Sequence, residues 1–297
     1  MTTVKALIKR NTVLFFKDKG MFFTALITPL ILLVLYATFL GNVYEDSFKT
    51  VVEAAGLTID QKLLSGCVAG QLMSSLLAVS CITVAFCSNL LSVQDKVSGA
   101  RADLTVSPVK PAVLSVSYFV ATLISTLIIC FVALVACLIY VRFAGWFLTT
   151  RDVLYLILDV FLLSLFGTAF SSVVNHFLKS QGQISAVGSI VSSCYGFICG
   201  AYMPISSFGE GLQKVLSFVP CTYATSLLRN HSLKSVFEKM EESLPAQIID
   251  GMKGAVDYNL YFFEEQVDVK AMYLIVGVWV VLLLLAYILM NSCKKTA

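Results

Sequence analysis

The sequence predicts an all-α, polytopic membrane protein with six transmembrane helices, and two observations lead to this fold class. Of its 297 residues, 58% are hydrophobic and only 13% are charged, whereas soluble domains are nearer to half apolar and a quarter charged. The charges are also absent from six long runs, and about 20 apolar residues suffice for a helix to cross the hydrocarbon core. Because such continuous runs do not alternate as barrel strands do, helices are expected.

The whole chain, residues 1–297, is interpreted as a single transmembrane domain, with spans set by the uncharged runs. In order, the expected elements are a basic interfacial helix (3–19), a first span (22–41), a second (64–93), a short charged segment (94–110), a third span (112–141), a fourth (153–175), a fifth (183–203), a long outer segment (204–269) and a sixth span (270–291).

Residues 3–19 carry an apolar face opposite basic residues. Val4, Leu7 and Ile8 recur at helical spacing, whereas Lys5 and Lys9 fall elsewhere. This pattern is typical of a helix that lies among the headgroups at the membrane surface. A simple positive flank for the first span is the alternative.

The distribution of basic residues predicts that both termini lie inside the cell. Six crossings place both ends on one side, and that side then carries eleven lysines and arginines, against four in the short loops of the other side. The eleven are Lys5, Lys9, Arg10, Lys17, Lys19, Lys96, Arg101, Lys110, Lys179, Lys294 and Lys295, and the four are Lys49, Lys62, Arg142 and Arg151.

Small residues at a spacing of four mark two of the expected spans. The fifth carries Gly188, Ser192, Gly196 and Gly200, and the second carries Gly66, Gly70, Ser74 and Ala78. Such stripes let another helix backbone approach closely within the bilayer. Packing within the chain explains either stripe, and a dimer interface is the alternative for the fifth span.

The outer segment begins with a second amphipathic stretch. Within 208–219, the residues Leu212, Val215, Leu216 and Val219 share one face. A short re-entrant helix between Pro204 and Pro220 fits this pattern, provided that its ends are buried against protein or water. Residues 234–268 then become polar and predict a small external helical cap without a core of its own.

Sequence signals for catalysis and for cofactor binding are absent. No Gly-x-x-x-x-Gly-Lys-Ser/Thr motif is present to hold nucleotide phosphates,. The two histidines are expected on opposite sides of the membrane, where they cannot share a metal. The nine cysteines lie mostly in apolar runs as small hydrophobic residues,, and the dispersed basic residues give no footprint for nucleic acid.

Asp159 interrupts the fourth span. An intramembrane carboxylate can serve ion or proton transport, so an ion- or proton-coupled secondary transporter is one functional hypothesis. A structural carboxylate near the outer helix end, within reach of Arg142 or Arg151, is the other reading.

Two segments resemble the type-2 ABC transporter permease family. Residues 95–109, which read DKVSGARADLTVSPV, are similar to the cytoplasmic loop between helices two and three of that family. Residues 200–204 (GAYMP), followed by 219–223 (VPCTY) and Arg229, are similar to its exit from helix five. The order and placement of the two motifs extend the resemblance over nearly the whole chain.

The resemblance implies a type V exporter-like fold, in which residues 3–19 form an elbow helix. It implies no enzymatic activity in this chain, no cofactor bound by it, and ATP and Mg on a separate ATP-binding subunit present in two copies. A second permease protomer, in a homodimer or a related heterodimer, and the lipid bilayer are the other expected partners. The expected location is the bacterial inner membrane, and the cargo is a drug, an antimicrobial peptide, a lipid or a glycan.

The resemblance also assigns roles to particular residues. The expected ATPase-coupling residues are Asp95, Lys96, Gly99, Arg101, Asp103, Leu104, Ser107 and Pro108. Packing or pathway residues of the fifth span are Gly188, Ser192, Gly196 and Gly200. The expected outer gate comprises Tyr202, Pro204, Leu212, Leu216 and Pro220.

Overall fold

The computed structural model describes residues 2–53, 56–106, 109–263 and 265–292. These residues form helices and one two-stranded antiparallel hairpin. The helices are α1 (Thr2–Lys17), α2 (Lys19–Leu35), the π-helical turn η1 (Tyr36–Leu40), α3 (Gly41–Glu53), α4 (Gln61–Val97), α5 (Ala100–Val106), α6 (Pro111–Ala144), α7 (Thr150–Phe177), α8 (Gln181–Ile198), the 3-10 turn η2 (Ile205–Ser207), α9 (Glu210–Leu216), α10 (Pro220–Met240), α11 (Ala246–Ala255) and α12 (Val269–Ser292), and the strands are β1 (Tyr261–Phe262) and β2 (Glu265–Gln266).

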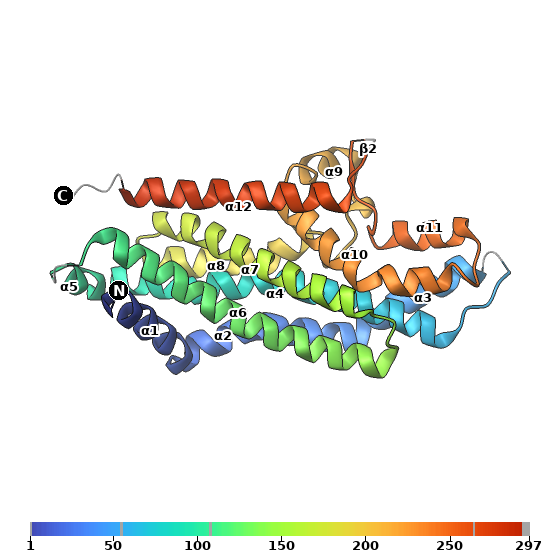
Figure 1. Ribbon diagram of the computed structural model, residues 1–297, viewed down its shortest axis with the longest axis horizontal. Coiled ribbons are helices and arrows are strands. Elements are labelled where there is room, and N and C mark those ends of the chain that lie inside the picture. The colour runs from blue at the N-terminus through green and yellow to red at the C-terminus, as the bar shows by residue number, and fades with distance from the viewer. Residues whose placement is uncertain (1, 54–55, 107–108, 264, 293–297) are drawn as a thin grey trace.

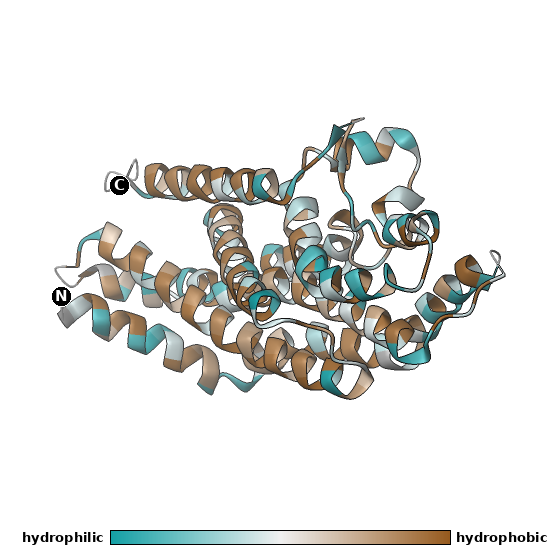
Figure 2. Cartoon of the chain, turned by 45° about the vertical axis from the view of Figure 1, so that its right-hand side comes forward, coloured by the Kyte–Doolittle hydropathy of each residue, from teal (hydrophilic) through white to brown (hydrophobic). Residues whose placement is uncertain are grey.

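The long helices lie side by side along one axis, with α5 at one end of the bundle and α3 and α11 at the other (Figure 1). We call these the α5 end and the α11 end. Helix α1 and the last turn of α12 lie towards the α5 end (Figure 1). Hydrophobic residues dominate the long helices, and hydrophilic residues gather in α1 and around α9 (Figure 2).

Helix α4 is the central element. Its 37 residues rise about 55 Å at 1.5 Å per residue, and it is in contact with α2, α6, α7, α8 and α10. Small residues allow this crowding: a Cβ added at Gly70 would lie 2.8 Å from the carbonyl oxygen of Ser232 on α10. The small-residue stripe predicted in the second span therefore packs within the chain at this position.

The helix that contains the first predicted span (22–41) extends beyond these bounds. Instead of ending near residue 41, the helix continues through η1 into α3. Polar residues such as Asn42 and Glu45 follow the predicted span, yet Tyr44, Phe48 and Val52 form a buried face of α3. Packing of α3 against α4 and α11 offsets the polarity of this segment and stabilises its helical conformation.

Five helices of the described chain are long and apolar enough to cross a membrane. They are Lys19–Glu53, Gln61–Val97, Pro111–Ala144, Thr150–Phe177 and Val269–Asn291. Helix α8 occupies the place of the fifth predicted span, but it ends at Ile198 rather than at residue 203. Its 18 residues include several serines, so the count of six crossings stays a prediction.

The outer segment comprises η2, α9, α10, α11 and the hairpin, and the re-entrant placement of its first helix stays a prediction. Only Leu216 of α9 is buried, whereas Leu212 and Val215 are 47% and 60% exposed. Helix α10 then runs from Pro220 past the predicted boundary at residue 234, because its side chains are buried almost throughout. Cap residues such as Met252 share one hydrophobic core with α4, so the cap has no core of its own.

Candidate functional site

Helix α5 forms a short protruding segment at its end of the bundle. Gly99 has a φ of +84°, a left-handed conformation that glycine adopts without strain, and it allows the sharp turn from α4 into α5. Asp103 is exposed, whereas Leu104 packs against a small cluster formed by Leu7 of α1 with Leu114 and Tyr118 of α6. The segment is thus anchored on its apolar side and open on its charged side.

Asp95 is turned inward. Its side chain accepts hydrogen bonds from Arg10 of α1 at 2.7 Å and from the Tyr118 hydroxyl of α6 at 2.5 Å. The hydrogen bond to Asp95 raises the pKa of the Arg10 guanidinium, so the guanidinium stays charged at any physiological pH. Asp95 therefore braces three helices beneath α5 and is not presented to solvent.

Lys96 is also used within the chain. Its Nζ donates to the carbonyl oxygens of Asn175 at 3.0 Å and His176 at 3.4 Å, at the end of α7. A cation at a helix C-terminus interacts favourably with the carbonyls left unpaired there. Of the remaining predicted coupling residues, Arg101 is half-buried, and Ser107 and Pro108 lie outside the described residues.

The predicted stripe of the fifth span is divided between two environments. Gly188 and Ser192 line an open hollow of about 510 Å³ between α8, α4 and the start of α2, where Gly20 and Thr24 lie opposite. Gly196 instead packs against the ring of Tyr202. Ser185 and Ser189 line the same hollow, and the exposed residues of α8 also include the apolar Ile190 and Phe197. The uncovered surface of this helix is therefore mixed, with small polar and large apolar side chains.

The exit from α8 is held by a buried charge cluster. Gly200 has a φ of +73°, and its carbonyl oxygen accepts a hydrogen bond from the guanidinium of Arg229, which is 1% exposed. The Asp257 carboxylate lies 3.7 Å from Arg229 and accepts the backbone N–H groups of Ile205 and Ser206. One carboxylate and one guanidinium thereby connect α10, the cap and the loop that leads to α9.

The π-helical turn η1, which follows α2, contacts the same loop. The Tyr36 hydroxyl, in the π-helical turn η1, donates to the carbonyl oxygen of Ala201 at 2.7 Å. Such turns shift the helix register locally and are frequent at functional sites. Tyr36 is 1% exposed, so the bond ties α2 to the exit of α8 through the interior.

The predicted gate residues lie around this loop but do not form one cluster. Tyr202 is half-buried against Phe197, with ring centroids 5.2 Å apart. Pro204 precedes η2, and Pro220 is buried at the first position of α10. Leu216 is buried, whereas Leu212 points outward.

Asp159 does not pair with Arg142 or Arg151, both of which are exposed. Its carboxylate lies 2.6 Å from Nδ1 of His231 on α10 and accepts the Tyr273 hydroxyl of α12 at 2.5 Å. Arg142 lies near the end of α6 and Arg151 in the first turn of α7, whereas the carboxylate of Asp159 is held by side chains of α10 and α12 instead. The described residues contain no group of His, Cys, Asp or Glu side chains that could hold a metal ion.

Sequence reasoning missed the residues that make these connections. Arg10 was grouped with the surface charges of a basic helix, and Tyr118 and Tyr273 looked like ordinary residues of apolar spans. Arg229 belonged to a family-like motif, but no local pattern pointed to Asp257. The one signal in the sequence that could have found them is an isolated charged residue among apolar ones, because a charge that is buried needs a partner.

The architecture is that of a multi-pass membrane protein. The short helix α5 protrudes at one end of the bundle, and the loop after α8, which is held by hydrogen bonds and the Arg229–Asp257 ion pair, lies nearer the other end. The family model of the ABC-2 type transporter matches residues 2–231, well over half of the chain. The chain therefore belongs to the ABC-2 type transporter family, and the resemblance seen in its sequence is confirmed. Comparison with curated proteins finds no match.

Membership of this family defines the chain as the permease subunit of an ABC transporter. Such a permease is the membrane transport component, and it works with ATP-binding subunits that supply the energy.

Proposed function

We propose that this chain is the permease of an ATP-driven exporter, which pairs with a second protomer and is coupled to two ATP-binding subunits. The single observation that carries the proposal is the braced α5 segment. Its outer side presents Asp103 to solvent, and its base is bound to α1, α4 and α6 through Arg10, Asp95 and Tyr118.

This arrangement suits mechanical coupling. A partner that binds α5 cannot move it alone, because Leu104 packs against α1 and α6 and because only Ser98 and Gly99 separate α5 from the end of α4. Movement of α5 would therefore tilt the long helices as rigid bodies, a usual form of conformational switching. We place the α5 end in the cytoplasm, in agreement with the positive-inside distribution.

The hollow between α2 and α8 supports a pathway between two protomers. It contains polar groups from Thr24, Ser185 and Ser192 beside apolar ones such as Leu90. A mixed lining of this kind suits a hydrophobic or amphipathic cargo, such as a drug, an antimicrobial peptide, a lipid or a glycan. The loop held by Arg229 and Asp257 is then the outer gate.

The coupling proposal is tested by reversing the exposed charge of α5. Asp103→Lys should weaken co-purification of the neighbouring ATP-binding subunit about tenfold, because an interfacial charge becomes repulsive. Asp250→Lys is the matched control, since Asp250 is also exposed but lies in α11 at the other end of the bundle. If both variants bound the ATP-binding subunit as well as the unchanged chain does, α5 would not be part of the interface with that subunit.

A secondary transporter driven through Asp159 is the second candidate, and it is favoured only by the position of a carboxylate in a span. Both carboxylate oxygens already contact side chains of α10 and α12, which supports a structural role. Asp159→Asn should therefore leave ATP-dependent export within about twofold of the unchanged protein, measured in vesicles. Export that persists without ATP and collapses with the proton gradient would support the alternative.

A further inference from the structure

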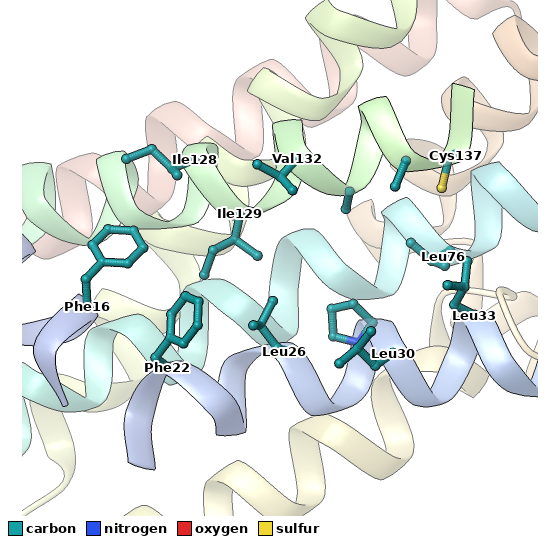
Figure 3. Close-up of a pocket in the computed structure, with 13 residues that line it drawn as sticks. Phe16, Phe22, Leu26, Leu30, Leu33, Leu76, Ile128, Ile129, Val132 and Cys137 are labelled. Atoms are coloured by element: carbon teal, nitrogen blue, oxygen red, sulfur yellow. The ribbon is translucent and has the colours of Figure 1, made fainter. Parts of the chain in front are cut away.

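A second hollow lies on the opposite side of α2 from the polar one. It has a volume of about 390 Å³, and its lining is apolar throughout. Figure 3 shows α2 and α6 on either side, with Leu26 and Leu30 from α2 and Ile129 and Val132 from α6. We call this hollow the α2–α6 groove.

The groove exists because α2 and α6 both pack on α4. Leu76 of α4 forms the floor and is 2% exposed, as is appropriate for a residue beneath two flanking helices. Leu30 and Val132 at the rim are 53% and 66% exposed. The groove is thus open along its length to whatever surrounds the bundle, which for a spanning helix is lipid.

One end of the groove is closed by the corner between α1 and α2. Phe16 and Phe22 line it there, with ring centroids 5.8 Å apart. The same corner carries Lys17 and Lys19, both exposed. Asp18 lies between the two lysines, but its side chain accepts the backbone N–H of Met21 and caps α2.

The two lysines outnumber Asp18, so this corner carries a net positive charge. Within the described part of the chain, the ion pairs include neither Lys17 nor Lys19. Helix α1 has no acidic residue at all. A basic group at the mouth of an apolar groove complements an anionic headgroup joined to a hydrocarbon chain.

We propose that the α2–α6 groove is a binding site for an anionic phospholipid, with one acyl chain along the groove and the phosphate beside Lys17 and Lys19. From Phe22 to Leu33 the helix rises about 16 Å at 1.5 Å per residue, a length that accommodates most of one leaflet's acyl chain. The site is distinct from the polar hollow on the α8 side of α2. Its ligand would fill the space into which α2 could otherwise approach α6.

The test uses the full-length chain in phosphatidylcholine nanodiscs with a trace of a photoreactive lipid, either phosphatidylglycerol or phosphatidylcholine, with a diazirine in one acyl chain. We expect the phosphatidylglycerol probe to label residues of the groove rim, including Leu30 and Val132. Lys17→Gln with Lys19→Gln should lower that labelling about fivefold per lysine and leave the phosphatidylcholine signal unchanged. Lys5→Gln, on the same helix three turns away, is the charge control.

A second pair of variants tests the groove itself. Ala133→Trp fills it, whereas Val135→Trp places the same ring on an exposed part of α6 outside the groove. Only Ala133→Trp should reduce labelling by both probes at the rim. Equal labelling by the two probes over the whole face of α6, insensitive to the lysines, would overturn the proposal, and so would loss of protomer association in Ala133→Trp with unchanged lipid labelling.

Discussion

At the scale of single residues, the Arg229 side chain combines a positive charge with almost complete burial. It is among the largest fully buried side chains, and it bonds the Gly200 carbonyl while facing Asp257 at 3.7 Å. A buried charge of this kind adds little net stability compared with an apolar pair, but removal of one partner leaves the other charge unpaired. Its position between α10 and the loop after α8 indicates that it fixes the geometry of that loop.

Replacement of this arginine should therefore be costly. Arg229→Leu is expected to lower the free energy of unfolding by about 3–5 kcal/mol, because Asp257 stays buried without its partner. The measurement is thermal unfolding of the purified chain in detergent. Arg229→Leu combined with Asp257→Asn should recover part of the loss, and a single variant as stable as the unchanged protein would contradict this role.

At the scale of secondary-structure elements, the crossing of α4 over α10 sets the centre of the bundle. A side chain at Gly70 would meet both the backbone of Ser232 and the side chain of Leu233. Because a backbone atom cannot move aside as a flexible side chain can, this contact admits only glycine. The equivalent test position on α8 is Gly188, where an added Cβ meets nothing within 4 Å.

These two glycines give a matched comparison. Gly70→Val should destabilise the fold by at least about 1–3 kcal/mol through overpacking, with a lower yield of folded protein from the membrane. Gly188→Val should fold normally, and any effect should fall on transport, since Gly188 lines the polar hollow. Size-exclusion profiles and thermal midpoints of both variants would reveal the difference, and similar losses of stability would refute it.

At the scale of the whole molecule, the uncovered side of α8 is the surface on which the proposed protomer pairing depends. Cys194 lies there and is exposed, whereas the other described cysteines are buried. Burial of a thiol in an apolar core keeps it from reagents. The native chain thus carries its own reporter for this surface.

A short bismaleimide should therefore link two copies of the chain through Cys194, with Cys293→Ser in the background to exclude the terminal cysteine. The expected product is a covalent dimer on a denaturing gel, and Cys194→Ser should abolish it. Leu274→Cys in that Cys194→Ser background is the control, since Leu274 is 69% exposed on α12 and is expected to face lipid. A dimer through position 274 but not 194 would place the pairing surface elsewhere.

Much of the candidate site could be located from the sequence but not understood from it. The loop at residues 95–108 was assigned as one coupling surface, yet Asp95 and Lys96 contact α1, α6 and α7 while Asp103 faces solvent. The sequence motif marks the place along the chain. Which side chains turn inward depends on helices that arrive from distant parts of the chain.

The sequence by itself determined that this is a helical membrane protein with long spans. In lipid, the backbone N–H and C=O groups must be hydrogen-bonded within the segment, and each side chain must be apolar enough to leave water. That requirement can be recognised locally. The tertiary structure alone decided the charge pairs, since Arg10 and Asp95 are 85 residues apart and Asp159 and His231 are 72 apart. It also decided the length of the continuous helix formed by α2, η1 and α3. The polar segment α3 is stabilised by burial of Phe48 and Val52 against neighbouring helices.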